Sequence, residues 1–185
     1  GRARWIGRDG QEHEIESLAE AGRESNAAIF TALHTDYAYQ LLSSCVDHWT
    51  HYREFNPRSK MLVVAPSINK AKDYAEKLIE MGVPCEVATS DEAQKAERAI
   101  KKFKRHDNDK NDVLVTVAMA YEGLDVPAIS HIACLTHIRS RPWIEQMVAR
   151  ACRVDGPAGD YESLYGYVFC PDDPLLHHCI NKIQD

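Results

Sequence analysis

The sequence contains no apolar run long enough to cross a membrane. Its longest unbroken apolar runs, such as residues 61–66, have the length of one strand, whereas a membrane-spanning helix needs about 20 apolar residues. No secretory signal opens the chain, which begins at Gly1 rather than Met. We therefore expect a cytoplasmic fragment of a longer protein, with no membrane partner.

Cysteine pairs and metal-ligand spacings are also missing. The six cysteines are scattered, and none lies in a Cys-x-x-Cys pair. This arrangement favours reduced thiols over a disulfide framework. His177, His178 and Cys179 form the one compact group of soft ligands, and without a second group at suitable spacing they predict no zinc site. We expect the chain to hold no metal of its own.

Two further absences concern charge and phosphate-binding loops. A net charge of −6 excludes a surface that is basic throughout, but a few local donors can still bind phosphates. The chain has no Gly-x-x-x-x-Gly-Lys-Ser/Thr loop. Asp91 and Glu92 resemble the acidic pair of a magnesium site, but such a pair follows an apolar strand and these residues do not. Thr89 and Glu92 instead have the spacing of a helix capping box. The sequence therefore predicts no complete nucleotide site.

What is present is a regular alternation of strands and helices after a polar beginning. Residues 1–30 predict an arm with some helix, and apolar residues at helical spacing predict a long amphipathic helix over residues 36–52. Further strands are predicted at residues 61–65, 83–88, 113–117, 131–135 and 166–170, with helices near residues 68–82, 89–103, from 142 onward and 174–183. Apolar strands that alternate with helices predict an α/β fold, with a mainly parallel sheet of five or six strands and helices on both faces.

Two of the expected helices carry apolar stripes. Helical spacing places Ala71, Tyr74, Ala75, Leu78 and Ile79 on the inner face of one helix, and Ala93, Ala96, Ile100 and Phe103 on that of the next. The second helix ends in the basic run of residues 101–105. A solvated helix end explains this run, and a patch that steers phosphates is the alternative.

One loop carries a compact glycine–carboxylate turn. Ligands of parallel sheets sit beyond the carboxyl ends of the strands, which selects residues 66–69, 118–125 and 136–141. In the second of these loops, Gly123 permits close backbone approach, and Asp125 can accept from a ribose hydroxyl or orient an arginine. A helix-capping aspartate in an ordinary turn is the alternative.

The segment after residue 142 predicts a helix with two opposite faces. Gln146, Arg150 and Arg153 fall at i, i+4 and i+7 and share one face. The opposite face is apolar and is formed by Ile144, Met147, Val148 and Ala151. Guanidinium groups suit phosphate oxygens, so the polar face predicts an anion contact. A solvated face with surface salt bridges is the alternative.

Taken in order, these segments resemble the C-terminal RecA-like lobe of superfamily 2 helicases and translocases. The turn at Gly123 and Asp125 resembles motif V, the helix with Gln146, Arg150 and Arg153 resembles motif VI, and residues 61–69 resemble motif IV. The resemblance covers residues 59–155. It implies that residues 57–185 form this lobe, and that residues 1–56 form an arm and a long helix leading from a first lobe outside this sequence.

The resemblance also implies an activity and partners. In the full-length protein we expect an ATP-dependent nucleic-acid motor, with ATP and Mg²⁺ bound mainly by the first RecA-like lobe. This chain alone should not hydrolyse ATP. The partner would be single- or double-stranded nucleic acid. DNA is favoured because the Glu122-Gly123-x-Asp125 turn resembles the form found in DNA repair, restriction and phage helicases.

Each role is carried over residue by residue. By resemblance, Arg153 is the arginine finger, and Arg150 either supports the γ-phosphate or couples the site to the nucleic acid. The nucleotide side includes Gln146, Gly123 and Asp125. Ser67, Asn69 and Thr116 are the candidates for strand-phosphate contacts. Two residues depart from the family pattern, since Ala149 replaces a glycine of motif VI and Ala118 replaces an Asp or Asn of motif V.

Two other classes of protein compete with the motor. A non-catalytic nucleic-acid or protein binding module built on a helicase lobe would not need Gln146, Arg150 and Arg153 together. A stand-alone α/β enzyme, such as a phosphatase, would need a nucleophile or base in a strand-end loop. Ser67 and Asp125 are the only candidates, and neither has a histidine near it in the sequence.

Overall fold

A five-stranded parallel sheet forms the centre of the computed structural model, which describes residues 3–6, 11–16, 25–117, 124–151, 153, 155–159, 164–173 and 176–177. The strands run in the order β4-β5-β3-β6-β7, and every neighbouring pair is parallel. Their bounds are β3 (Lys60–Ala65), β4 (Glu86–Ala88), β5 (Val113–Val117), β6 (Ile129–Cys134) and β7 (Tyr167–Phe169). The predicted α/β fold is confirmed.

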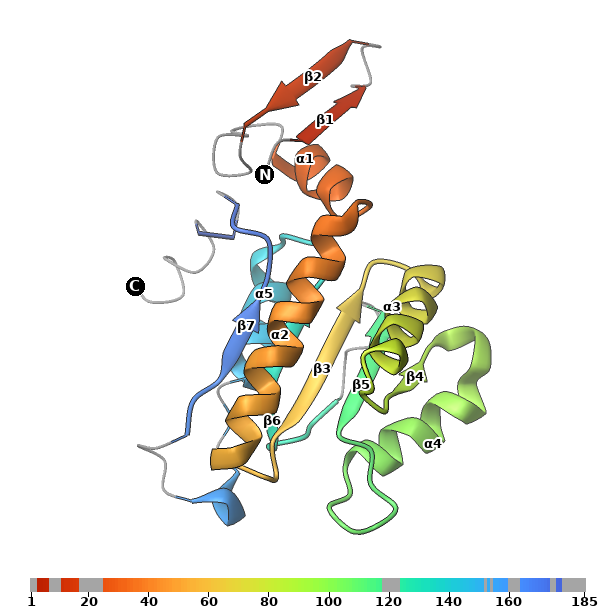
Figure 1. Ribbon diagram of the computed structural model, residues 1–185, viewed down its shortest axis with the longest axis vertical. Helices are drawn as coiled ribbons and strands as arrows, with labels where there is room; N and C mark the ends of the chain where they lie inside the picture. Colours follow the sequence, from red (N-terminus) through yellow and green to blue (C-terminus); the bar gives the residue numbers. More distant parts are fainter. Residues whose placement is uncertain are drawn as a thin grey trace.

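Helices cover both faces of this sheet (Figure 1). On one face lie α2 (Asp36–Phe55) and α3 (Ile68–Glu80), and on the other lie α4 (Ala93–Phe103) and α5 (Arg141–Ala151). The central strand β3 contributes side chains to the hydrophobic core on each face of the sheet. Its residues Met61, Val63 and Ala65 pack with α2 and α3, while Leu62 and Val64 pack with α4 and α5. A strand covered on both faces is apolar at most positions, which explains the unbroken apolar run at residues 61–65.

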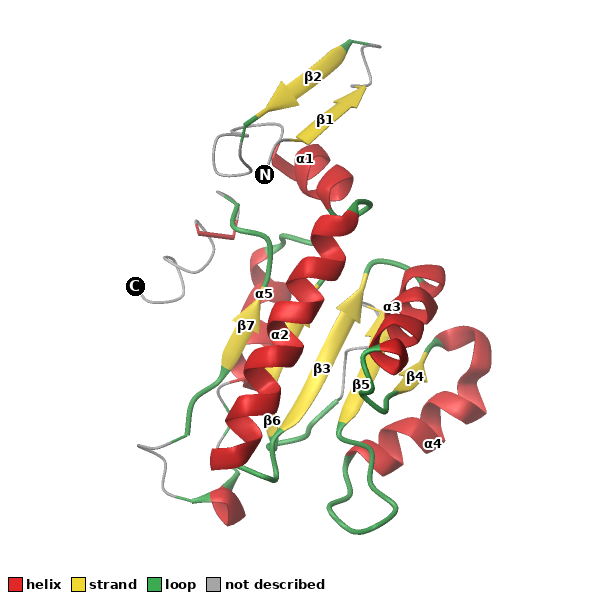
Figure 2. Ribbon diagram, in the orientation of Figure 1, coloured by secondary structure: helices red, strands yellow, loops and turns green. Residues whose placement is uncertain are grey.

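The N-terminal arm differs from its prediction. Two short strands, β1 (Ala3–Ile6) and β2 (Glu12–Ile15), pair antiparallel (Figure 2), and α1 (Ser25–Ala32) follows them. Arg4 forms ion pairs across this hairpin with Glu12 and Glu14, at 3.2 and 3.4 Å. The sequence did not predict the hairpin, because its segment is polar and its strands are too short for a clear alternating pattern.

Two local predictions around α3 and α4 are wrong. The Thr89 hydroxyl donates to the Asp91 carboxylate at 2.5 Å and caps no helix. A 3-10 turn, Ser90–Glu92, comes first, so α4 begins at Ala93. Ile79 was expected on the inner stripe of α3, yet it is 63% exposed. The remaining stripe residues of α3, Ala71, Tyr74, Ala75 and Leu78, are buried as predicted.

The other elements differ from their predictions mainly in length. The helix predicted over residues 36–52 continues to Phe55, and Asn56 is its C-cap residue. Strand β6 begins at Ile129 rather than at residue 131, and β4 covers only the second half of the predicted strand. The helix predicted over residues 174–183 lies outside the described residues except for residues 176–177. Among the described residues, no helix is both long and apolar enough to span a bilayer.

A buried histidine on β6 leads to a prediction about pH. His131 is fully buried and shares 2.7 Å hydrogen bonds with Ser130 Oγ and His48 Nδ1. Burial, together with the smaller effect of the nearby His48, lowers the pKa of His131 to about 3. In the unfolded chain this imidazole takes up a proton near its ordinary pKa of about 6.5. Acid therefore favours the unfolded chain, and stability should fall below that pH by roughly 1 kcal/mol per pH unit.

The measurement is urea unfolding from about pH 7 to about pH 5. The variant His131→Gln should lose much of this pH dependence, whatever its absolute stability. The matched control is His51→Gln, which changes an exposed histidine on α2 and should keep the wild-type dependence. Parallel curves for wild type and His131→Gln would show that His131 is not responsible.

Candidate functional site

The two faces predicted for the motif VI helix are present in α5. Ile144, Met147 and Ala151 are buried, whereas Gln146 is exposed. The helix ends at Ala151, however, so Arg153 lies beyond it. The prediction that Arg153 continues the helix face of Gln146 and Arg150 is therefore wrong. The segment before β7 lies directly against this helix end. A Cβ atom on Gly166 would collide with the Ala151 carbonyl, so only glycine fits there.

Both arginines nevertheless reach the same loop. Arg150 Nη1 donates to the carbonyl oxygen of Leu124, and Arg153 Nη1 pairs with the carboxylate of Asp125. The Arg153 and Asp125 side chains are 47% and 60% exposed. An ion pair this exposed contributes about 0–1 kcal/mol to stability. The contact therefore orients Arg153 more than it stabilises the fold. Gly123 lies outside the described residues.

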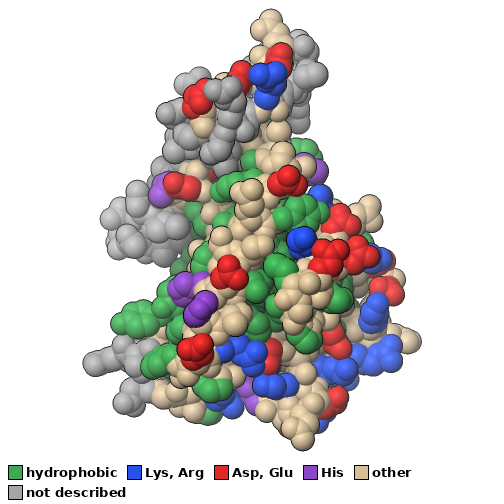
Figure 3. All heavy atoms as spheres, viewed as in Figure 1, with side chains coloured by type: hydrophobic (Ala, Val, Ile, Leu, Met, Phe, Trp, Pro, Cys, Tyr) green, Lys and Arg blue, Asp and Glu red, His purple; other side chains and the backbone are tan. Residues whose placement is uncertain are grey.

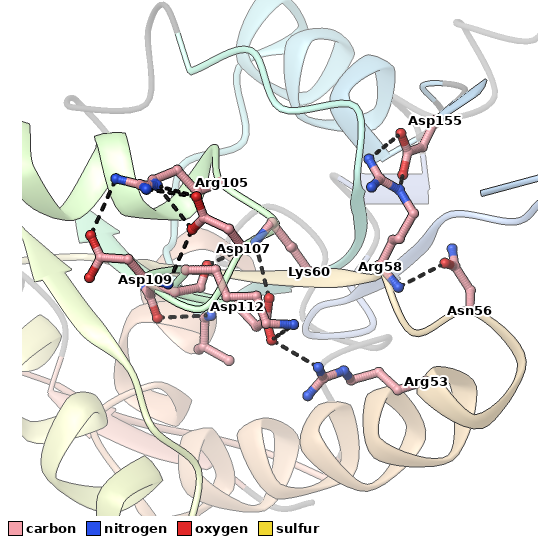
Figure 4. Close-up of polar contacts among 12 residues, drawn as sticks. Arg53, Asn56, Arg58, Lys60, Arg105, Asp107, Asp109, Asp112 and Asp155 are labelled. Carbon is pink, nitrogen blue, oxygen red and sulfur yellow. Dashed lines mark hydrogen bonds and ion pairs between the residues drawn. The ribbon is translucent and has the colours of Figure 1, made fainter. Parts of the chain in front are cut away.

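A third arginine, Arg58, binds the chain just after Arg153. Arg58 donates to the two carboxylate oxygens of Asp155, through Nε at 2.9 Å and Nη2 at 3.3 Å (Figure 4). Asp155 is buried, and the backbone N–H of Arg58 donates to the side chain of Asn56 at 3.2 Å. A bidentate pair to a buried carboxylate fixes geometry well. Arg153 is thus positioned from both sides, by the helix before it and by Asp155 after it.

Next to this anchor lies a buried lysine at the start of β3. Lys60 is fully buried, and its Nζ donates to the Asn111 carbonyl and to Asp112, each at 3.0 Å. Burial lowers the pKa of Lys60, and its hydrogen bond to Asp112 acts in the opposite direction. Arg53 of α2 also pairs with Asp112, at 2.8 Å. These contacts, drawn in Figure 4, join α2 to the loop before β5.

Arg153 and Asp125 lie at the amino-terminal edge of the sheet. Arg153 lines one small hollow with Asn56, Ala128 and Ile129, which stand where β3 and β6 begin. The expectation that the loop up to Asp125 lies beyond the carboxyl ends of the strands is wrong for Asp125. The reason is topological. A connection between two parallel strands must return to the opposite edge before the second strand starts.

The three candidates for strand contacts lie toward the other edge. Ser67 caps α3, its hydroxyl accepting from the Lys70 N–H at 3.3 Å, and Asn69 is exposed in the first turn. Thr116 is 2% exposed and its hydroxyl donates to the Ala88 carbonyl at 3.1 Å. The structure thus brings Ser67 and Asn69 together at the surface but places Thr116 inside the sheet.

Sequence reasoning missed a buried ion pair at this carboxyl edge. Arg139 Nε donates to Asp173 at 2.9 Å, and the two side chains are 3% and 0% exposed. Arg139 also donates to the carbonyls of Thr136 and Ile138, both at 2.8 Å. The pair therefore ties the loop after β6 to the segment after β7. The partners are too far apart in sequence for any local pattern to reveal them.

No metal site is found in the described part of the chain, and most cations of the basic run at residues 101–105 are paired. No group of three potential ligands occurs there, and the cysteines whose state is described, Cys45, Cys85, Cys134 and Cys170, are free thiols. His178 and Cys179 fall outside those residues. In the basic run, Lys101 pairs with Glu97, Lys102 with Glu86 and Arg105 with Asp107. These pairs favour the solvated helix end.

The sheet order and the two arginines on the Asp125 loop define a RecA-like α/β lobe. The chain belongs to the family of the helicase conserved C-terminal domain, whose model matches residues 38–155. A candidate helicase, helicase 22 of the Sulfolobus islandicus filamentous virus (isolate Iceland/Hveragerdi), is 33% identical over 93 residues. That match covers 50% of this chain and 16% of the viral protein.

Several solved helicase structures share the fold. Domain 2 of the DEAD-box helicase Mss116p, bound to an RNA duplex, matches with a TM-score of 0.54 and 13% identity, over 80% of this chain and 57% of that one. S. cerevisiae Dbp5 bound to RNA and ADP BeF3 matches with a TM-score of 0.52 and 15% identity, over 77% and 36%. The Pyrococcus furiosus Hef helicase domain matches with a TM-score of 0.50 and 19% identity, over 69% and 24%. The prediction of a helicase C-terminal domain is confirmed by the family model, and the predicted RecA-like fold by the solved structures.

Proposed function

We propose that this chain is the C-terminal motor lobe of an ATP-dependent nucleic-acid helicase or translocase. The observation that carries the proposal is the meeting of Arg150 and Arg153 with the Leu124–Asp125 loop at an accessible surface. Two guanidinium groups held by adjacent residues of one loop suit the oxygens of a phosphoryl group. Gln146 is exposed on the same helix face as Arg150 and belongs to the same proposed surface.

In this role Arg153 acts as the arginine finger and Asp125 holds its guanidinium in place. Arg150 supports the γ-phosphate side, and Gly123 completes the turn. The donors fit an anion, but the described residues include no cluster of acidic ligands for Mg²⁺. ATP and Mg²⁺ would therefore be held mainly by a first RecA-like lobe, and the free energy for movement would come from hydrolysis of that ATP. This chain alone would be inactive.

The opposite edge would hold nucleic acid. Ser67 and Asn69 stand at the amino end of α3, where free backbone N–H groups and the helix dipole favour a phosphate. Such contacts follow the sugar–phosphate backbone and carry no base preference. Mss116p and Dbp5 are bound to RNA, whereas our preference for DNA rests on the Glu122-Gly123-x-Asp125 turn. Cytoplasmic location remains part of the proposal.

Binding of a labelled oligo-dT strand to the chain tests this assignment. We expect weak binding whose log affinity falls linearly with log salt, by about 0.7 per phosphate contacted. Asn69→Asp adds a carboxylate at the proposed contact and should weaken binding about tenfold at low salt. Because an acidic residue in the first turn stabilises a helix, this loss would not reflect unfolding.

The matched control is Gln94→Glu, which adds the same charge on the exposed side of α4 and should change the affinity less than about twofold. A strong preference for one base sequence that persists at high salt would contradict the proposal. Tighter binding of oligo-rU than of oligo-dT would remove the preference for DNA and leave the phosphate contact intact.

A further inference from the structure

The outer edge of the sheet at β4 is open. In the part of the chain that the structure describes, β4 pairs only with β5, and Figure 2 shows it at the margin of the sheet. An edge strand presents unpaired N–H and C=O groups on its free side. Glu86, Val87 and Ala88 therefore offer backbone hydrogen bonds to an incoming chain.

Beside this edge lies a groove of about 400 Å³ between α3 and α4, a size typical of small binding sites. Buried Ala75 and Ala99 contribute to its walls. The other side chains of the lining are Ile79, Cys85, Glu86, Val87, Lys95, Arg98 and Lys102, and the one carboxylate among them, Glu86, pairs with Lys102. Ile79 is 63% exposed on α3, although the rest of the apolar stripe of that helix is buried. The groove thus combines a free strand edge with an exposed apolar side chain.

The two walls of the groove differ in chemistry. The wall from α3 is apolar, with Ile79 beside Cys85 and Val87, and the latter two pack with the α3 core. The wall from α4 is cationic, with Lys95, Arg98 and Lys102, and Figure 3 shows Lys and Arg side chains gathered over α4.

Lys95 and Lys102 already pair with Glu92 and Glu86, at 3.4 and 3.1 Å. No ion pair is found for Arg98 within the described residues, and it is exposed. Its guanidinium is therefore the cation that remains available to a partner's carboxylate.

We propose that this groove binds an extended peptide segment of another protein, which adds to β4 as a sixth strand. Side chains of an added strand alternate between the two faces of a sheet. One set would meet the apolar wall of α3 and the other the cationic wall of α4. The segment should therefore alternate apolar with acidic residues. A nucleic acid cannot form strand pairing with the free edge of β4, and it does not need the apolar contact that Ile79 offers. The proposal does not depend on the motor function, because it uses none of the residues assigned to it.

The probe is a synthetic peptide, Glu-Val-Asp-Ile-Glu-Val-Asp with both ends blocked, titrated into the isotope-labelled chain and followed by NMR. We expect shifts centred on β4, Ile79 and Arg98. The same peptide with alternate backbone nitrogens methylated cannot complete the strand pairing and should not bind. Its counterpart with lysine in place of each acidic residue should not bind either.

Arg98→Glu reverses the charge of the cationic wall and should weaken binding of the acidic peptide at least about fivefold. Lys104→Glu makes the same change at an exposed position outside the groove, and its effect should stay below about twofold. Equal losses in the two variants, binding of the methylated peptide, or shifts elsewhere would overturn the proposal. So would oligo-dT displacing the peptide, or self-association through β4 without it.

Discussion

Replacing Arg153 with alanine is expected to abolish nucleic-acid-stimulated ATP hydrolysis in the full-length protein while leaving its melting temperature nearly unchanged. An arginine finger stabilises charge that develops during phosphoryl transfer and contributes roughly 10³–10⁵ in rate. That corresponds to about 4–7 kcal/mol of barrier. The Arg153–Asp125 ion pair is exposed, so its loss removes only about 0–1 kcal/mol of stability. The two effects are therefore well separated.

Steady-state ATPase and thermal melting should be measured on the same preparations. Arg153→Lys should rescue poorly, because an ammonium group lacks the planar fork. Arg141→Ala is the matched control, since Arg141 lies at the exposed start of α5 and pairs with Glu145. Activity above about a tenth of the wild-type rate in Arg153→Ala would mean that Arg153 is not the finger. The non-catalytic binding module would then be the better interpretation.

Asp173→Ala is expected to lower the free energy of unfolding by about 3–5 kcal/mol. The Arg139 side chain, 3% exposed, would be left as a buried charge without its carboxylate. The Leu176 N–H, which donates to Asp173 at 3.0 Å, would lose its acceptor. This is a large loss for a domain whose total stability is about 5–15 kcal/mol.

Urea unfolding of three variants separates the causes. Replacing both partners, Arg139→Met with Asp173→Leu, removes the buried charge and should recover at least about 2 kcal/mol of the loss. Glu145→Ala breaks an exposed pair and should cost less than about 1 kcal/mol. A loss in Asp173→Ala no larger than that of Glu145→Ala would show that the buried pair does not hold the loop after β6.

The order of elements from α2 to β7 and the buried face of α5 followed from the sequence because each rests on local periodicity. Strands β3, β5 and β6 are covered on both sides and are therefore mostly apolar, with Ser130 and His131 of β6 as buried polar exceptions. Ile144, Met147 and Ala151 repeat at helical spacing, so their common face needed no tertiary information.

Other features depend on where chain segments end or meet, and the sequence does not encode these locally. Arg153 has helical spacing with Arg150, but the chain leaves the helix at Ala151, against which Gly166 packs. Ile79 fits the apolar stripe of α3 and is still 63% exposed, in the groove beside β4. Arg139 and Asp173 come together only when β6 and β7 pair.

The separation of the candidate residues to two ends of one sheet has a mechanical consequence. Arg153 lies where β6 begins, and Asn69 lies just after β3 ends. The two residues are therefore separated along the sheet by the length of β3, which is six residues. Six residues of strand span roughly 20 Å, and a close-packed sheet hardly compresses over that length. If the proposed roles hold, a displacement applied at the edge with Arg153 would reach the edge with Asn69 nearly undiminished. The lobe would then move as a rigid body.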